Sequence, residues 1–259
     1  MEREELAALE AAADCLARAR YVIALTGAGL SVESGIPPFR GPGGLWTKHG
    51  EPPMNGFQRF LADPRRAWED RLNPSGPMRE LWSALSAARP NPGHHAFVDL
   101  ENLGVLRALI TQNVDNLHRL AGTQRLLEIH GNATLIRCLG CGRRFARDEI
   151  DFAELPPHCP GCEGLLKSDT VSFGEPIPSD VLEGCFEEAA RADCMIVAGT
   201  SATVYPAAQF PLDIHQRGGD LIEVNPYPSE LTAVSRHVLQ GSAGEMLPQL
   251  VALVRARRR

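Results

Sequence analysis

Long hydrophobic runs and a secretion signal are both missing from this sequence. No stretch approaches the 18 consecutive apolar residues that a membrane-spanning helix requires. The first twenty residues are acidic and mix charges with Leu and Ala, so they lack the basic flank and apolar centre of a signal peptide. These absences predict a soluble, cytoplasmic protein that does not enter a membrane.

Dense positive charge is also scarce. The formal net charge is −6, whereas a surface that coats nucleic acid must neutralise many phosphates with Lys and Arg. The closing RARRR is the one dense basic run, and we interpret it as a solvated tail rather than an anion-binding site. We therefore expect no general nucleic-acid binding, while the oligomeric state stays open.

The cysteines predict a metal site rather than disulfides, because seven is an odd number and no secretion signal precedes them. Four of them form two C-x-x-C pairs, CLGC at 138–141 and CPGC at 159–162, whose spacing suits a zinc ribbon. All four positions of a tetrahedral ion would be filled, so the zinc would be structural; a redox role for either pair is the alternative. The predicted ligands are Cys138, Cys141, Cys159 and Cys162. We expect Cys15, Cys185 and Cys194 to be core residues.

Short, β-branched apolar runs alternate with helical segments along most of the chain. The runs at 21–25, 105–110, 194–199 and 221–225 are expected to be strands. Apolar residues at helical spacing predict helices from Leu6 to about Arg20, at 93–103, 179–191 and 206–217, and after Gly244. This alternation predicts an α/β fold, a Rossmann-like doubly wound parallel sheet whose ligand crevice lies at the carboxyl ends of the strands.

Two segments interrupt the alternation and predict a smaller, inserted module. Residues 42–90, rich in Pro and Trp, should form its helical part, and residues 133–170, which hold the paired cysteines, its zinc ribbon. The Rossmann-like domain would then consist of residues 1–41, 91–132 and 171–259.

The loop after the first predicted strand lacks the third glycine of a dinucleotide-binding fingerprint. In ALTGAGLSVESGIPPFRGPGG, Gly27 and Gly29 follow the strand, but Val32 stands where G-x-G-x-x-G requires glycine. The segment still places backbone N–H groups and a helix start where a pyrophosphate would fit. The prolines beyond it stiffen a long excursion that carries Phe39 and Arg40 toward the crevice, which a plain turn would not need.

Polar side chains gather after the second predicted strand, in TQNVDNLHRLAG. Their density suggests ligand binding, although helix capping by Asn113 or Asp115 is the plainer interpretation. Further on, EIHGN places His130 beside this loop. A histidine pKa near about 6.5 suits a general base at neutral pH, although a lone histidine is as often structural.

Taken together and in this order, several segments resemble the sirtuins, the NAD-dependent protein lysine deacylases, of the bacterial type and close to the desuccinylase-like class. The segments are GAGLSVESGIPPFR, TQNVDNLH, EIHGN, the two C-x-x-C pairs, SFGEPIP, AGTSATVYPAA and EVNPYPSEL. The resemblance runs from about Ala19 to Pro248. It implies NAD as a consumed co-substrate, structural zinc, and an acyl-lysine protein or peptide bound between the domain and the module.

The resemblance also implies a reaction and the residues that carry it. The acyl oxygen would attack the nicotinamide ribose and expel nicotinamide, and His130 would then act as base on a ribose hydroxyl, leading to acyl transfer onto ADP-ribose. Asn113 would join His130 as a catalytic residue. The implied cofactor-binding residues are Gly27, Ala28, Gly29, Ser31, Phe39, Arg40, Trp46, Gln112, Asn113, Asp115, Gly199, Thr200, Ser201, Asn225, Pro226, Tyr227 and Ala243. The peptide would add as a strand beside VSFGE, through Val171, Phe173, Gly174 and Glu175.

The resemblance does not determine which acyl group on the lysine is preferred. Family members that favour succinyl or malonyl lysine carry Y-x-x-R in the helix after the cofactor loop, and AWEDRL aligns Trp68 with the Tyr and Arg71 with the Arg. Arg71 would pair a substrate carboxylate, whereas Trp68 offers no hydroxyl. The alternative is that Trp68 packs in the module and Arg71 is a surface charge. The expected activity is therefore deacetylation, with desuccinylation or demalonylation as a further option.

Two other functions remain open on the sequence alone. A mono-ADP-ribosyltransferase would share the NAD site but pass ADP-ribose to a protein. A non-catalytic NAD-sensing or zinc-ribbon binding module would not need His130, and the presence of His130, Asn113 and Asp115 together argues against it.

Overall fold

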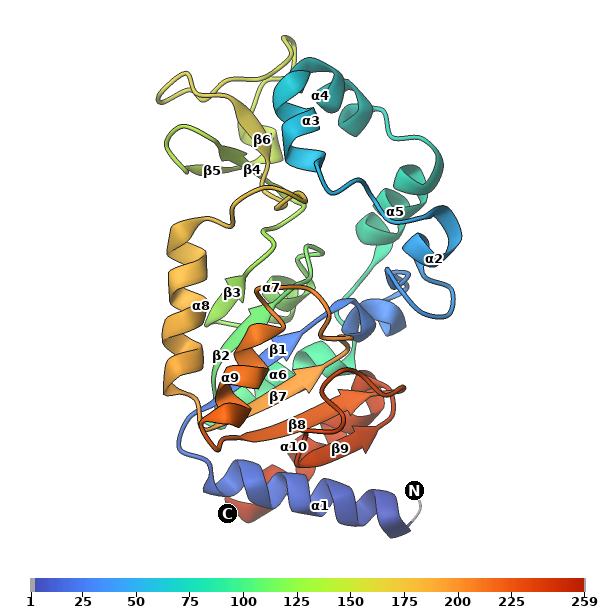
Figure 1. Ribbon diagram of the computed structural model, residues 1–259, viewed down its shortest axis with the longest axis vertical. Coiled ribbons are helices and arrows are strands. Elements are labelled where there is room, and N and C mark those ends of the chain that lie inside the picture. The colour runs from blue at the N-terminus through green and yellow to red at the C-terminus, as the bar shows by residue number, and fades with distance from the viewer. Residues whose placement is uncertain (1–2, 259) are drawn as a thin grey trace.

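A six-stranded parallel sheet forms the centre of the larger domain in the computed structural model, which describes residues 3–258 (Figure 1). The strand order is β3-β2-β1-β7-β8-β9. The strands are β1 (Val22–Thr26), β2 (Leu106–Thr111), β3 (Leu126–Glu128), β7 (Cys194–Ala198), β8 (Asp220–Asn225) and β9 (His237–Gln240). The chain runs outward from β1 to β3 and resumes on the other side of β1, so the topological switch point lies between β1 and β7.

Helices cover both faces of this sheet, which is why β1 and β7 are buried at every position. On one face, α1 (Arg3–Arg18), α6 (Pro92–Asn102) and α10 (Ala243–Arg257) bury a large apolar cluster. On the other, α8 (Ser179–Arg191) and α9 (Gln209–Gln216) bury a second one. The short α7 (Leu117–Ala121) follows β2. The predicted Rossmann-like class is confirmed, and the main helices and strands lie close to their expected ranges.

The two outermost strands were not predicted. Both β3 and β9 are short and partly exposed, so neither shows the continuous apolar run that marks the central strands. They extend the sheet at its edges without changing its centre.

The inserted module consists of a three-stranded antiparallel sheet and helices packed on it. Its sheet has the order β5-β4-β6, from β4 (Leu135–Cys138), β5 (Arg144–Ala146) and β6 (Leu166–Ser168). A one-turn helix, η2 (Arg147–Glu149), follows β5. The helices α3 (Gly56–Ala62) and α4 (Pro64–Leu72) bury Phe60 and Trp68 against Ile136 and Leu166 of that sheet.

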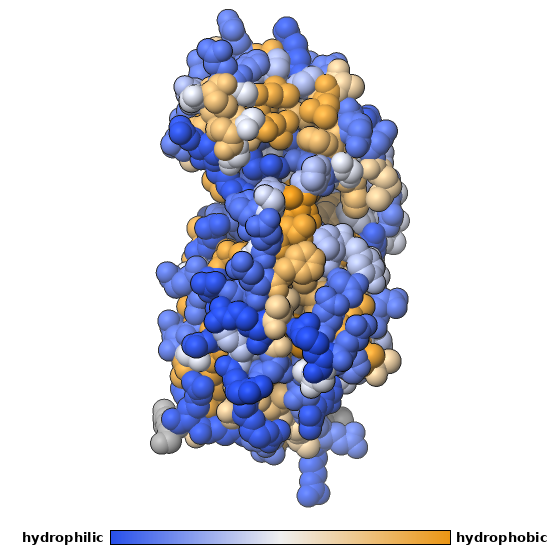
Figure 2. Space-filling view, turned by 60° about the vertical axis from the view of Figure 1, so that its left-hand side comes forward, coloured by the Kyte–Doolittle hydropathy of each residue, from blue (hydrophilic) through white to orange (hydrophobic). Residues whose placement is uncertain are grey.

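The remaining helices of residues 42–90 lie between module and domain. The segment includes α2 (Leu45–His49) and α5 (Gly76–Ala87). Leu81 and Leu85 of α5 pack against Ile36 and Leu117 of the sheet domain. Figure 2 shows the surface narrowing between the two parts on one side. Among residues 3–258, no helix combines the length and apolar character needed to cross a membrane.

Candidate functional site

Three glycines allow the loops after β1 and β7 to cross in direct contact. The Gly27 N–H donates to the Ala198 carbonyl at 3.1 Å, and the Gly29 N–H donates to the Gly199 carbonyl at 2.8 Å. A Cβ on Gly29 would lie 2.8 Å from the Gly199 Cα, and one on Gly199, whose φ is +65°, would lie 2.2 Å from the Leu30 nitrogen. The crossing therefore excludes side chains at the switch point of the sheet.

The crossing determines which backbone N–H groups of these two loops are free to bind a phosphate. The N–H groups of Gly27 and Gly29 already donate to protein carbonyls, so they are not free to bind a pyrophosphate. The N–H groups of Ala28, Thr200 and Ser201, by contrast, have no acceptor within residues 3–258. The glycines allow the two loops to come into contact, and the free N–H donors belong to the adjacent residues Ala28, Thr200 and Ser201.

The missing third glycine has a structural explanation. The segment after Gly27 is a short 3₁₀ helix, η1 (Ala28–Ser34), and Val32 on it is 44% exposed. Since Val32 faces away from the sheet, no close backbone approach requires glycine there.

Asn113 ties the loop after β2 to the loop after β1. Its Nδ2 donates to the Gly27 carbonyl at 3.0 Å and to Ser31 Oγ at 3.1 Å. The Ser31 hydroxyl in turn donates to Asp115 Oδ2 at 2.6 Å. Asp115 Oδ1 accepts the Leu117 N–H at 2.9 Å, so Asp115 also has the capping role considered from sequence. Burial raises the pKa of Asp115, and the bond from Ser31 opposes that rise.

His130 is oriented by the same loop. Its Nδ1 lies 3.1 Å from the Gln112 carbonyl, which can only accept, so Nδ1 carries the proton and Nε2 keeps a free lone pair. The Gln112 side chain donates to Thr200 Oγ1 at 2.9 Å. Burial lowers the pKa of His130, against a smaller opposing effect of the Gln112 carbonyl. His130 is therefore neutral at pH 7, the form that a general base requires.

The loops after β7 and β8 meet at Asn225, whose Nδ2 donates to the Thr200 carbonyl at 3.1 Å and to Glu223 Oε1 at 2.9 Å. Pro226 and Tyr227 follow it on the surface.

Ala243 is buried at the first turn of α10. That helix begins against η1, since Glu33 accepts the Gly244 N–H at 2.7 Å. Loops after four adjacent strands thus converge on one edge of the sheet.

An aromatic chain links the loop after β1 to the segment 171–175. The Phe39 and Trp46 rings are 4.8 Å apart, and Trp46 lies 5.8 Å from Phe173. The Arg40 guanidinium stacks 4.6 Å above Trp46 and pairs with Glu51 at 3.1 Å. The expected cofactor loop and the expected peptide segment are therefore in contact.

The segment 171–175 is a turn rather than a strand, with Gly174 at φ +78°. The Val171 carbonyl and the Phe173 N–H have no partner within residues 3–258, so both are available to an added strand. The Glu175 side chain is buried, and its Oε2 lies 2.9 Å from Lys167 Nζ. Glu175 can thus offer a peptide only its backbone, the kind of contact expected for this segment.

Trp68 and Arg71 have different environments. Trp68 is 1% exposed and its indole N–H donates to the Leu166 carbonyl at 2.9 Å, so it packs in the module and cannot contact an acyl chain. Arg71 Nη2 donates to the Ala133 carbonyl at 2.8 Å, and its guanidinium stacks 4.5 Å from the Trp82 ring. Arg71 has no carboxylate partner within residues 3–258, and its buried Nε has no acceptor. Burial lowers the pKa of Arg71 to about 10, so it stays charged at pH 7.

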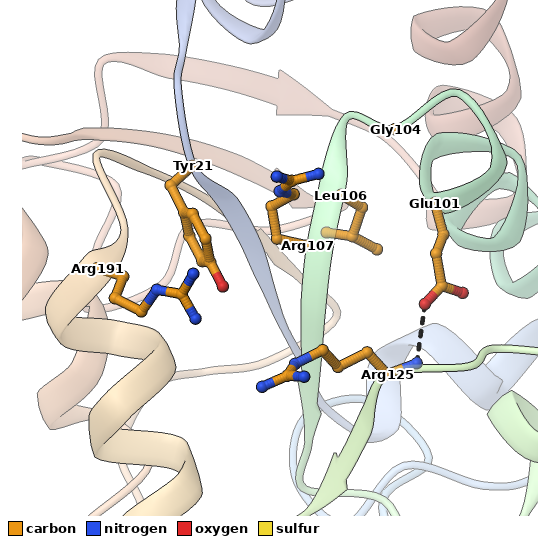
Figure 3. A pocket seen from close by; sticks show the side chains of 7 residues that line it. All are labelled: Tyr21, Glu101, Gly104, Leu106, Arg107, Arg125 and Arg191. Carbon is orange, nitrogen blue, oxygen red and sulfur yellow. Dashed lines mark hydrogen bonds between the residues drawn. The ribbon is translucent and has the colours of Figure 1, made fainter.

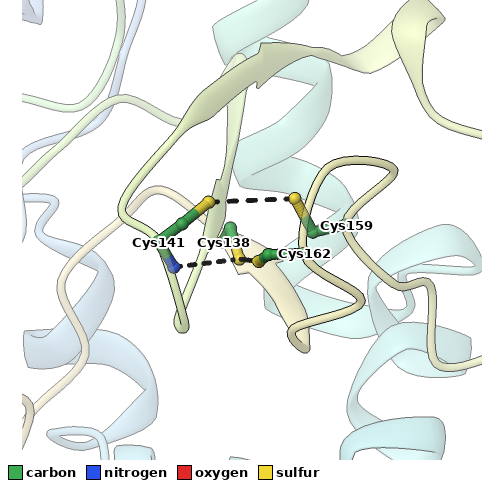
Figure 4. Close-up of side chains that lie close together, drawn as sticks. All are labelled: Cys138, Cys141, Cys159 and Cys162. Carbon is green, nitrogen blue, oxygen red and sulfur yellow. Dashed lines mark hydrogen bonds between the residues drawn. The ribbon is translucent and has the colours of Figure 1, made fainter.

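The four predicted zinc ligands form one cluster, shown in Figure 4. All four Sγ atoms lie within 4.8 Å of one another, with 3.5 Å between Cys138 and Cys162 and 3.9 Å between Cys141 and Cys159. A tetrahedral zinc with Zn–S bonds of about 2.3 Å places sulfurs about 3.8 Å apart, so the thiols fit the ion. The N–H of Gly140 points at the Cys138 sulfur from 3.3 Å. With four thiolates and no open position, this zinc is structural.

A buried polar network that the sequence does not predict lies beneath the site. Thr26 Oγ1 donates to Thr111 Oγ1 at 2.9 Å, and Thr111 Oγ1 accepts the Asn113 N–H at 3.1 Å. His118 Nε2 lies 3.0 Å from Thr26 Oγ1, and the His94 ring lies 4.9 Å from the His118 ring. His118 stands within a motif quoted above, but nothing in the sequence indicates that its side chain turns into the core.

Comparisons with known proteins agree with this geometry. A sequence model described as the Sir2 family matches residues 27–206. An NAD-dependent protein deacylase of Thermococcus kodakarensis is 45% identical over 251 residues, covering 94% of this chain and 95% of that protein. The NAD-dependent protein deacylase 1 of Archaeoglobus fulgidus is 43% identical over 245 residues, covering 93% and 95%.

Solved structures give the same result. A crystal structure of a Sir2 homolog–NAD complex has a TM-score of 0.80 at 42% identity, covering 96% of this chain and 95% of that one. A Sir2–p53 peptide–NAD⁺ structure has a TM-score of 0.77 at 30% identity, covering 97% and 98%.

Proposed function

This chain belongs to the Sir2 family, and on that premise we propose that it is an NAD-dependent protein lysine deacylase in which His130 is the catalytic base. The observation that carries the assignment of His130 is its orientation: the Gln112 carbonyl holds Nδ1 and leaves Nε2 free beside the converging loops. Relatives covering more than nine-tenths of the chain are named as deacylases, and related structures hold NAD or a peptide.

In the proposed reaction, NAD binds across the glycine crossing. The free N–H groups of Ala28, Thr200 and Ser201 face the pyrophosphate, which suits donors at a loop crossing. An acyl-lysine peptide lies against 171–175 and pairs with the Val171 carbonyl and the Phe173 N–H. The acyl oxygen bonds to the nicotinamide ribose carbon as the bond to nicotinamide breaks.

His130 then acts on the ribose. Its Nε2 takes the proton of a ribose hydroxyl, whose oxygen attacks the acyl carbon, and water completes release of the lysine. The products are nicotinamide, the free lysine side chain and acyl-ADP-ribose. Asn113, whose amide hydrogens are committed to Gly27 and Ser31, serves by positioning the loop after β1.

Acyl-lysine peptides incubated with NAD test this proposal. We expect nicotinamide release that depends on peptide, together with a product of the mass of acyl-ADP-ribose. His130→Ala should lower turnover by roughly 10²- to 10⁴-fold, the usual contribution of a general base. His215→Ala, at an exposed histidine of α9, is the control. A mass gain on the protein substrate in place of acyl-ADP-ribose would instead identify an ADP-ribosyltransferase.

We further propose that the site accepts succinyl and malonyl groups beside acetyl, with Arg71 as the partner of the acyl carboxylate. The support is the unusual state of this guanidinium, which is largely buried and charged, has no carboxylate within residues 3–258, and has one unpaired N–H. A bound carboxylate would supply the missing charge and acceptor.

Arg71→Met separates this role from simple packing. A charge-assisted pair contributes about 1.5–3 kcal/mol, so kcat/KM for a succinyl peptide should fall roughly 10- to 150-fold, with little change for the acetyl peptide. Arg66→Met, on an exposed position of the same helix, is the matched control. Equal losses for both peptides would mean that Arg71 only holds Ala133 in place.

A further inference from the structure

A recess of about 270 Å³ lies at the amino edge of the sheet, whereas the glycine crossing lies at the carboxyl edge. Figure 3 shows the side chains that line this recess. Tyr21 precedes β1, Arg107 lies near the start of β2, Arg125 precedes β3, and Arg191 ends α8. The Glu101 side chain closes one side. Three arginines far apart in the sequence thus line one hollow that lies away from the residues assigned to NAD and peptide.

The tyrosine at the centre of this recess is held in place. The guanidinium of Arg191 lies 4.3 Å from the centre of the Tyr21 ring, and that of Arg107 lies 5.8 Å from it. The Tyr21 hydroxyl donates to Glu188 Oε2 at 2.7 Å. The ring and its hydroxyl are thus both engaged, and Arg191 and Arg107 each lie within the range of a cation–π contact with the ring.

The carboxylates here do not satisfy the three guanidinium groups. Glu188 is occupied by Tyr21 and by Arg125, whose Nε lies 2.9 Å from Oε1, while Arg191 reaches it only at 3.9 Å. Glu101 accepts backbone N–H groups, including that of Arg125 at 2.8 Å. Arg107 makes no ion pair with any residue of 3–258.

We propose that this recess binds a small anion of the phosphate class, either the free ion or a phosphate monoester, outside the catalytic crevice. Of the three guanidinium groups that line the recess, only that of Arg125 has a carboxylate closer than 3.9 Å within residues 3–258. Guanidinium groups present several N–H donors in a planar fork that matches phosphate oxygens. They also come from three different elements, which suits a tetrahedral oxyanion with acceptors on every side better than a planar carboxylate.

Isothermal titration of the full chain with inorganic phosphate tests the proposal, with saturating ADP-ribose present to occupy the catalytic crevice. Charge-assisted contacts at a partly exposed site predict a dissociation constant in roughly the millimolar range. This constant should rise as salt is added, because salt screens the charges. A parallel titration with phosphoserine separates the two sources. Tighter binding of phosphoserine identifies a phosphate ester as the ligand, and equal or weaker binding identifies the free ion.

Arg107→Gln is the decisive variant, because removing an unpaired, exposed side chain leaves every ion pair of the recess in place. Phosphate binding should weaken roughly tenfold, whereas deacylation stays unchanged. Arg65→Gln, on the exposed face of α4, changes the net charge equally and should bind as the wild type does. NMR signals of the arginine side chains should move at Arg107, Arg125 and Arg191. The proposal is overturned if phosphate gives no saturable signal, or if both variants bind it alike.

Discussion

The sheet domain and the zinc module are held together by different forces. The sheet domain buries two extended apolar clusters, one on each face of its sheet. The module has one small cluster, and two of its buried members are the zinc ligands Cys138 and Cys159. Hydrophobic stabilisation grows with buried area, so the module should depend more on the metal and on buried ion pairs than the sheet domain does.

The ion pairs of the module point toward the proposed substrate segment. Lys167 on β6 and Arg137 on β4 both pair with Glu175, at 2.9 and 2.5 Å. Asp169 accepts the Asn132 N–H at 3.2 Å, two residues after the proposed base. In the proposed site, the zinc module therefore positions the peptide side, and the sheet domain positions the NAD side. A variant in the zinc module should therefore affect peptide binding more than NAD binding, and a variant in the sheet domain should do the reverse.

Loss of zinc should have the largest effect. In Cys159→Ala, or after treatment with a strong chelator, the module should unfold, because zinc binding contributes about 10–16 kcal/mol in small zinc-dependent domains. Zinc content should fall below one per chain, and Trp68 fluorescence should shift as its buried ring meets water. Far-UV circular dichroism should keep the signal of the sheet domain. Cys185→Ala, at a buried thiol of α8, should retain zinc; if Cys159→Ala keeps full activity, the two parts are not coupled as described.

Gly199→Ala tests the proposed NAD side of the site, at the glycine crossing of the sheet domain. The new Cβ would lie 2.2 Å from the Leu30 nitrogen at a φ of +65°. Left-handed strain costs about 1–2 kcal/mol and overpacking about 1–3 kcal/mol, which together predict a loss of about 2–5 kcal/mol in unfolding free energy. KM for NAD should rise more than KM for the peptide. Gly218→Ala, also at positive φ but in open space, isolates the strain from the crossing.

Lys167→Met tests the peptide side. Breaking a buried pair costs about 3–5 kcal/mol, and the lower end applies here because Glu175 keeps Arg137. KM for the peptide should rise while KM for NAD changes little, since Glu175 anchors the segment 171–175. The double variant Lys167→Met/Glu175→Gln should be less destabilised than the sum of the single variants. Additive losses, or an equal rise in both KM values, would contradict the coupling.

The sequence predicts the sheet domain better than the zinc module, because the sheet domain is built on extended apolar burial and the module is not. Continuous apolar runs such as YVIAL mark buried parallel strands, so the sheet centre and its helices follow from local pattern. The zinc ligands follow from the spacing of the cysteines. The strands of the module are three or four residues long and are stabilised by metal and ion pairs, which leave no periodic trace.

The site shows the same limit. The loops that meet at the switch point could be predicted, because strand ends of a parallel sheet share one edge. Whether a given side chain turns into the site or into the core could not be predicted, as Trp68 on α4 and Glu175 after β6 show. Trp68 fills the small core of the module, and Glu175 pairs with Lys167 on β6 and with Arg137 on β4, the latter 38 residues away. Both orientations depend on tertiary partners rather than on neighbours along the chain.

Acid should also destabilise the sheet domain, through its buried histidines. Burial lowers the pKa of His94 to about 4 and that of His118 well below its usual value. A histidine in the unfolded chain has a pKa of about 6.5, so above that pH these two groups do not change the free energy of unfolding. Below that pH the unfolded chain binds protons that the buried histidines of the folded chain do not bind, so the folded state loses stability. His94 should therefore remove about 1.4 kcal/mol of stability per pH unit between about pH 6.5 and 4, and His118 should act in the same direction.

His94→Gln tests this assignment because the His94 Nδ1 accepts the Asn91 N–H at 3.3 Å, a bond that glutamine at the third position of a helix also makes. Urea unfolding across this pH range should show a slope shallower by one proton than that of the wild type, with zinc release followed in parallel to separate loss of the module. His215→Gln, at an exposed position, should leave the slope unchanged. If His94→Gln unfolds with the wild-type slope, acid acts through other groups, and the pH sensitivity belongs to the zinc thiolates instead, which also take up protons as the metal leaves.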